Sequence, residues 1–287
     1  MSKRLNRFKK ERKRKFKIPR WVQHMIPIDE IWEDGIFKTG VFYSKCYRFG
    51  DINFKVASDE HKREMLNRYA ALLGALDCDS HVQIGAFHHR PTKWDPLSSA
   101  GIALTGDVND CYRKECNQVI GGKFSKRISY VEDKYITISS KKRNLEDAEE
   151  YFKRIEADIS RACERLGSAL VAMNAEERLL ILKNFYRPEE SNFFSFNVRK
   201  RKQRREDFRN YIAPDGIRRH WNRLEVGNRF VRVLFLRDIA NYVDDDFIDT
   251  MISRNQDILY SVNIVPIPKN EGIQDAENRH MGVLTNN

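Results

Sequence analysis

Hydrophobic residues recur every three or four positions in several stretches of the chain, which is the spacing of one face of an α-helix. The longest such stretch covers 145–173, and Asn144 precedes it as a helix-capping residue. A second helix is predicted over 174–185, because Asn174 followed by Glu177 forms a capping-box pattern. The same spacing predicts further helices over 58–77, which begins at a Ser58 cap, over 107–119 and over 243–252.

Other stretches alternate apolar and polar residues or are short continuous apolar runs, and both patterns are typical of β-strands. Residues 28–54 contain two turn signals, Asp34-Gly35 and Thr39-Gly40, and so predict hairpins. Further strands are predicted over 82–87, 134–139, 258–267 and, as a buried strand, Phe230–Leu236. The fold class is therefore predicted to be α+β, with mixed, largely antiparallel strands and hairpins packed with several amphipathic helices.

Charge changes this picture only at the start of the chain. The 287 residues include 52 Lys+Arg and 41 Asp+Glu, a formal net charge of +11. Residues 1–20 hold eleven of the bases and one acid, Glu11, so the body at 21–287 is nearly neutral. We therefore expect a basic, disordered tail before a folded body, with a possible subdivision in the polar stretch 187–219.

Two basic segments are candidate contacts for an anionic partner. Clustered Lys and Arg bind nucleic acid by counterion release, bind anionic lipid by charge, or simply keep a segment solvated. All three interpretations are open for the tail and for the run at 199–205. The candidate residues are Lys9, Lys10, Arg12, Lys13, Arg14, Lys15, Lys17, Arg199, Lys200, Arg201, Lys202, Arg204 and Arg205.

A nucleotide-binding loop is the first catalytic feature to test. Gly121-Gly122-Lys123 comes nearest to a phosphate-binding loop, but that motif requires Gly where the chain has Asn117 and Ser or Thr where it has Phe124. We expect a glycine turn there, no nucleotide or other cofactor in this chain, and no catalytic residues.

Metal-binding patterns are equally weak. His88 and His89 are adjacent and would point to opposite faces of a strand, and the spacing of Cys111 and Cys116 does not match zinc knuckles. Asp244-Asp245-Asp246 fits the first turn of a helix. The acids Glu30, Glu33 and Asp34 fit a polar hairpin. No metal site is predicted, and five scattered cysteines suit a reducing compartment.

The segment IPRWVQHMIPIDEIWEDGIFKTGVFYSKCYRFGDINF at 18–54 resembles the start of the conjugal transfer ATPases of type IV secretion systems, closest to the branch from Gram-positive integrative conjugative elements. The similarity continues in the same order through KYITIS, RLGSAL, NAEERLLIL, YIAPDG, RVLFLRD, NIVPIPKNE and ENRHMGVLTNN, the last at 277–287. It therefore covers nearly the whole chain.

The resemblance implies that residues 21–287 are an N-terminal assembly domain. Family members continue into a RecA-like motor that binds ATP and Mg, and no position in this chain matches that motor. The implied partners are inner-membrane channel proteins and neighbouring ATPase subunits, and the implied location is the cytoplasmic face of the bacterial membrane. The alternative, from the residues alone, is a basic nucleic-acid-binding protein acting through the tail.

Overall fold

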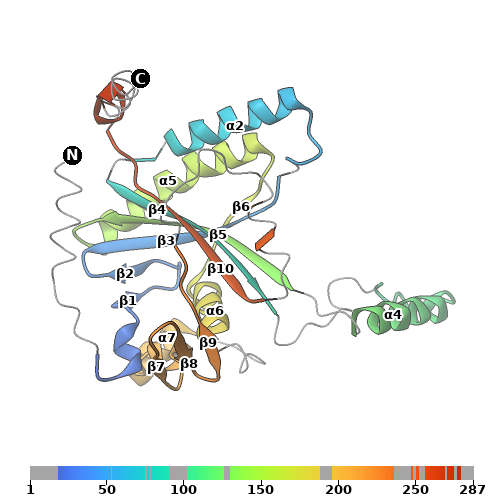
Figure 1. The fold of residues 1–287 in the computed structure, drawn as a ribbon. Helices are drawn as coiled ribbons and strands as arrows, with labels where there is room; N and C mark the ends of the chain where they lie inside the picture. The colour runs from blue at the N-terminus through green and yellow to red at the C-terminus, as the bar shows by residue number, and fades with distance from the viewer. Residues whose placement is uncertain are drawn as a thin grey trace.

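The computed structural model has an α+β fold built on a seven-stranded antiparallel sheet, with a separate three-stranded sheet (Figure 1). The strand order in the large sheet is β1-β2-β3-β5-β4-β10, and β6 pairs with β3. The structure describes residues 19–52, 54–74, 76–77, 79–90, 102–125, 130–187, 196–235, 247, 250–251, 256–268, 270–274 and 277–278. The predicted fold class is confirmed.

The predicted hairpins form the first three strands of the sheet. Strands β1 (Glu30–Ile31), β2 (Phe37–Thr39) and β3 (Phe42–Phe49) pair as antiparallel neighbours. The two glycines of the predicted turns, Gly35 and Gly40, have φ of 80° and 59°. Only glycine adopts these left-handed values without strain, so both turn predictions are confirmed.

Strand β3 lies at the centre of the sheet. One of its edges pairs with β5 (Val131–Lys141), which also pairs with β4 (Ser80–His89). The other edge is shared between β2 and β6 (Leu170–Ala172). Strand β10 (Ile258–Ile264) pairs with β4, so the predicted final strand forms but ends three residues earlier than expected.

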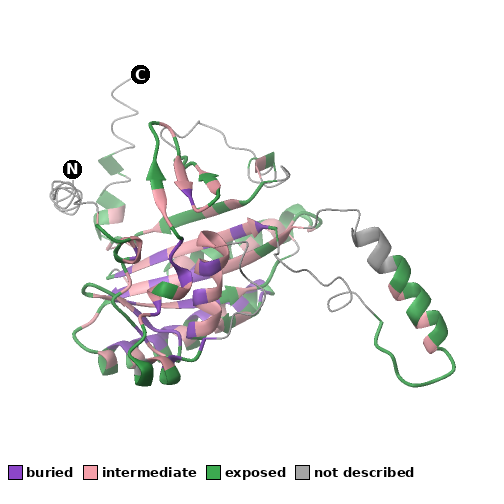
Figure 2. Ribbon diagram, turned by 90° about the horizontal axis from the view of Figure 1, so that it is seen from below, coloured by how far each residue is buried: buried purple, intermediate pink, exposed green. Residues whose placement is uncertain are grey.

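Two helices, α2 (Asp59–Gly74) and α5 (Leu145–Leu166), cover one face of the sheet (Figure 1). The Asn144 side chain caps α5 by accepting a hydrogen bond from the Asp147 amide at 2.8 Å. The apolar faces of both helices pack on inward-facing residues of β3, β4 and β5 to form the main core cluster. Figure 2 shows the buried residues gathered along the sheet and the helices that face it.

Helix α5 is shorter than the spacing predicts. It ends at Leu166 because Gly167 adopts a left-handed conformation, with φ of 80°, and 170–172 then forms strand β6. The apolar residues beyond this glycine continue the helical spacing by coincidence. Likewise α2 ends at Gly74 rather than at residue 77.

The opposite face of the sheet carries the second core cluster. Here 3₁₀-helix η1 (Val22–Met25) and helices α6 (Ala175–Tyr186), α7 (Val198–Arg204) and α8 (Arg209–Ile212) come together. The predicted capping box at Asn174 and Glu177 is present at the start of α6. Leu179, Phe196 and Ile212 are buried in this cluster together with Ile26 and Phe37.

The strand predicted over Phe230–Leu236 forms only at 230–231, and its predicted burial is wrong; Leu236 lies outside the described residues. Strands β7 (Ile217–Arg219), β8 (Leu224–Val226) and β9 (Arg229–Val231) form the small sheet, and the chain leaves β9 after Val231. Phe230 and all of 233–235 are exposed, because among the described residues no second layer from either core cluster covers them. Apolar composition alone does not reveal whether such a layer exists.

A helix between β4 and β5 extends further than predicted. Helix α4 (Asp110–Ser125) begins three residues later than the predicted helix and continues through Gly121-Gly122, so the expected glycine turn is wrong. Helix propensity disfavours glycine only by about 1 kcal/mol, which neighbouring residues can offset. Most of the predicted helix 243–252, with Asp244-Asp245-Asp246, and nearly all of the basic tail lie outside the described residues.

Contacts of the first hairpin with the start of α6 attach this helix to the sheet. The Arg178 guanidinium donates hydrogen bonds to the carbonyl oxygens of Gly35 (2.6 Å) and Ser44 (2.9 Å) and lies 3.9 Å from the Phe37 ring centroid. Burial lowers the pKa of this guanidinium. At Gly35 a methyl group would lie 1.9 Å from the carbonyl oxygen of Met173, so the turn touches backbone directly.

We predict that Gly35→Ala lowers the free energy of unfolding by about 2–4 kcal/mol. Alanine is strained at this positive φ, and its methyl group would clash with the Met173 carbonyl group. Urea denaturation measures this change. Gly74→Ala is the matched control, since nothing lies within 4 Å of the added methyl group and φ is not positive there. It should change stability by less than about 1 kcal/mol. Equal effects of the two substitutions would contradict the proposed contact.

Candidate functional site

The structure describes one of the two predicted basic segments. Lys9, Lys10, Arg12, Lys13, Arg14, Lys15 and Lys17 lie outside the described residues. The second run forms α7 and the residue after it, where Arg199 pairs with Glu33 at 2.8 Å. Arg201 pairs with Glu206 and lies 4.0 Å from the centroid of the Tyr211 ring. These two arginines therefore already have partners within the protein.

Three other members of the run, Lys200, Arg204 and Arg205, are exposed, and the side chain of Lys202 is not described. Arg205 also has a positive φ of 54°, at the turn that ends α7. An exposed trio of cations can contribute to binding a polyanion, but each exposed contact is weak and sensitive to salt. The helix by itself does not form an enclosed anion site.

A cavity of about 460 Å³ lies between the first hairpin, α5 and the start of α7. Trp32, Ile36, Phe152 and Val198 form its apolar lining. Its charged lining is balanced: the acids are Glu33, Asp34 and Glu149, and the bases are Lys45, Lys153 and Arg199. Lys45 is also paired with Glu156 at 2.9 Å. Balanced charge of this kind favours neither a phosphate nor a metal ion.

The hairpin acids have structural roles, as the sequence predicts. Glu30 pairs with Lys38 at 3.2 Å across β1 and β2, and Asp34 accepts a hydrogen bond from the Ile36 amide at 3.3 Å. Glu33, as noted, pairs with Arg199 of α7.

The histidine pair lies on β4 with its side chains on opposite faces. His89 is buried and its Nε2 lies 3.1 Å from an Asp133 carboxylate oxygen, whereas the His88 ring stacks on Tyr130. Cys46 and Cys163 are buried, which raises the pKa of each thiol, and Cys111 and Cys116 are exposed on α4. Among the described residues, no three His, Cys, Asp or Glu side chains gather in a group able to hold a metal ion.

The feature that sequence reasoning missed is an arm, defined here as residues 102–125. It is inserted between β4 and β5, which are neighbours in the sheet, and α4 stands away from the rest of the molecule (Figures 1 and 2). Its exposed apolar residues are Ile102, Leu104, Val108 (91% exposed), Tyr112 and Val119. The helical spacing predicted α4 itself, but no signal in the sequence indicates that it makes few contacts with the other described elements.

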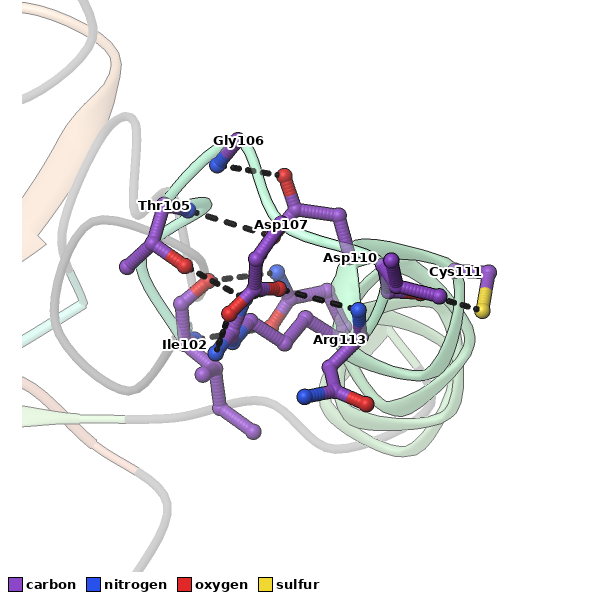
Figure 3. A network of polar contacts seen from close by, with 10 residues as sticks. Ile102, Thr105, Gly106, Asp107, Asp110, Cys111 and Arg113 are labelled. Atoms are coloured by element: carbon purple, nitrogen blue, oxygen red, sulfur yellow. Dashed lines mark hydrogen bonds and ion pairs between the residues drawn. The ribbon is translucent and has the colours of Figure 1, made fainter.

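A polar network at the N-terminus of α4 orders the arm without help from the sheet (Figure 3). Arg113 contacts both Asp107 and Asp110, the latter at 2.6 Å. The Asp110 carboxylate accepts hydrogen bonds from the amides of Thr105 (3.1 Å) and Gly106 (2.8 Å). The hydrogen bonds from Arg113 hold the pKa of Asp107 and Asp110 below the usual range. The network fixes the loop against the helix N-terminus, where the helix dipole favours acids.

The Asn117 side chain makes a second connection between the loop and α4. It accepts from the Ile102 amide at 2.8 Å and donates to the Ile102 carbonyl oxygen at 3.0 Å. The loop therefore returns along the helix as a self-supported hairpin, and the exposed apolar side chains are presented in a fixed arrangement.

Comparison with known proteins adds no assignment: no protein-family model and no curated protein matches the chain. In the part of the chain that the structure describes, no helix combines the length and the apolar character needed to cross a bilayer. The molecule is therefore characterised by its structure: an α+β fold with two sheets and the arm.

We predict that Arg113→Met raises the pKa of Asp107 and Asp110 toward the ordinary value of 3.8, because their main hydrogen-bond donor is removed. In the protein without this substitution, the two carboxyl pKa values are lowered, so the network stabilises the arm above pH 3.8. This stabilisation is lost as the pH falls through the lowered pKa values of the folded state. Carboxyl titration by NMR measures both effects. Unchanged carboxyl pKa values in the variant would contradict the described network.

Proposed function

We propose that this chain is a non-catalytic assembly and docking domain of a conjugative DNA-transfer ATPase of a type IV secretion system. The resemblance supports this proposal, and its segments fall on the framework of the fold. KYITIS lies in β5, RLGSAL joins the end of α5 to β6, and NAEERLLIL comprises the capping residue and most of α6. These are adjoining elements around β3.

The observation that carries the proposal is the arm. It exposes apolar side chains, is held by its own network and, among the described elements, makes few contacts with the sheet body. A preorganised apolar surface outside the core serves binding, because ordering it in advance reduces the entropy lost on association. We propose that the arm contacts an inner-membrane channel protein at the cytoplasmic face of the membrane.

In this proposal the chain does no chemistry of its own. ATP and Mg would be bound by a separate RecA-like motor, and the domain would hold that motor beside the channel and beside neighbouring ATPase subunits. Movements driven by ATP hydrolysis would then be transmitted through the rigid sheet to the membrane partner.

Replacing residues 91–129 by a two-residue Asn-Gly turn tests whether the arm contacts the channel protein. His89 of β4 is directly opposite Val131 of β5, so a hairpin turn can join the strands without changing their register. We predict an unchanged thermal midpoint and a loss of co-purification with the channel proteins of the same conjugation system. Quantitative pull-down from solubilised membranes measures the second effect.

Point variants provide a matched comparison. Val108→Asp with Tyr112→Asp alters the arm (91% and 66% exposed), and Leu66→Asp with Val171→Asp alters two exposed apolar positions on the body (55% and 59%). We expect a reduction in recovery of about tenfold or more for the arm pair and little change for the body pair. Equal recovery with both pairs, or ATP turnover by the purified chain, would contradict the proposal.

The alternative, a nucleic-acid-binding protein, is favoured by the exposed Lys200, Arg204 and Arg205. It predicts tight DNA binding that weakens steeply with salt and is unaffected by the arm variants. Fluorescence anisotropy with labelled DNA, performed on the same set of proteins, distinguishes the two functions.

A further inference from the structure

The three-stranded sheet exposes a group of apolar side chains that neither core cluster contains. We call β7, β8, β9 and residues 232–235 the ribbon. Its exposed apolar residues are Trp221 (94%), Phe230 (66%), Val233 (76%), Leu234 (81%) and Phe235 (81%). Scattered exposed apolar residues are common, but three consecutive ones after β9, with an exposed Trp in the β7–β8 turn of the same small sheet, indicate a contact surface.

The ribbon is also strongly basic. Arg218, Arg219, Arg223 and Arg232 are exposed. Glu225 is the one acid in 216–235, and it is already engaged by Arg218 at 3.6 Å and by His220 at 3.1 Å. A fifth arginine, Arg229, pairs with Asp257 outside the ribbon. The exposed apolar side chains therefore share the ribbon with arginines whose charge its single acid does not balance, so a partner that complements both is anionic as well as apolar.

We propose that the ribbon is a contact site for an anionic lipid bilayer, with the 233–235 segment entering the interface and the arginines binding lipid phosphates. Exposed Trp and aliphatic side chains next to Arg suit the boundary between headgroups and acyl chains. A single-stranded nucleic acid fits less well, because Val233 and Leu234 have no ring on which a base can stack. In addition, Arg223 already lies over the Phe230 ring, 4.6 Å from its centroid.

The position of the ribbon brings other basic segments to the same end of the molecule. Val22 and Ile26, next to the point where residues 1–18 join the described body, pack in the second core cluster with Ile212 of α8. Strand β7 begins at Ile217, soon after α8 ends. Figure 1 shows the start of the described chain, α7 and the ribbon together at one end of the molecule. The described chain therefore begins at the same end as the ribbon, and the eleven bases at 1–20 can add to the attraction of an anionic surface.

This inference does not rest on the proposed function, since it concerns lipid and the ribbon rather than a protein partner and the arm. The test is co-sedimentation of the full chain with vesicles of phosphatidylcholine containing about one-third phosphatidylglycerol. We expect binding to these vesicles and little binding to phosphatidylcholine alone.

Leu234→Asp should weaken vesicle binding by about tenfold or more, because it replaces an inserted apolar side chain with a charge that anionic lipid repels. Val56→Asp is the matched control, since Val56 is 77% exposed on the main body, and Leu234→Phe should preserve binding. Arg232→Gln should weaken binding by about fivefold. Circular dichroism establishes that each variant retains the fold.

Equal binding of Leu234→Asp and Val56→Asp would overturn the proposal, because the tail would then account for binding by charge alone. No vesicle binding by the unchanged chain would also overturn it. So would a Leu234→Asp variant that loses affinity for single-stranded DNA while its affinity for vesicles is unchanged, since this result would assign the ribbon to nucleic acid.

Discussion

The Asp34-Gly35 turn rests directly on the backbone that leads into α6, and the arrangement on both faces of the sheet depends on this contact. The Met173 amide donates to the Cys46 carbonyl oxygen at 3.0 Å, and Arg178 binds the carbonyl oxygens of Gly35 and Ser44. A buried carbonyl without a donor costs free energy, so these bonds fix where α6 begins relative to β3. The placement of α6 in turn positions the second core cluster, which includes the start of the described chain and α7.

The surfaces available for binding lie outside this framework. The arm leaves the sheet between two paired strands, and the ribbon follows α8, whose Ile212 is part of the second cluster. A rigid sheet with contacts carried by inserted or terminal segments is a common way to combine stability with recognition. It also separates the two proposed contacts, one with protein and one with lipid, so that each can be altered without disturbing the core.

Most of the fold could be predicted from the sequence because its elements have local signals. The Asn144 cap, the capping box at Asn174 and the glycine turns each depend on a few neighbouring residues. The predictions fail where contacts between residues distant in the sequence decide the structure. Phe230–Leu236 has the pattern of a core strand, yet Phe230 and residues 233–235 are exposed; the arm has the pattern of an ordinary helix, yet α4 stands away from the sheet. Of the candidate site, the basic run was identified, but the pairing of Arg199 with Glu33 joins residues that only the fold brings together, whereas Arg201 pairs with the nearby Glu206.

The central claim, that the arm meets a membrane channel protein, can be tested through the arm's own cysteines. Cys111 and Cys116 are exposed, whereas Cys46 and Cys163 are buried, so a thiol-reactive photo-crosslinker carried by a Cys78→Ser variant should label the arm selectively. Crosslinking in cells that express the conjugation system, followed by mass spectrometry of the adducts, identifies what the arm contacts. The account predicts an adduct with an inner-membrane channel protein. Adducts with DNA alone, or none in cells where conjugation proceeds normally, would contradict it.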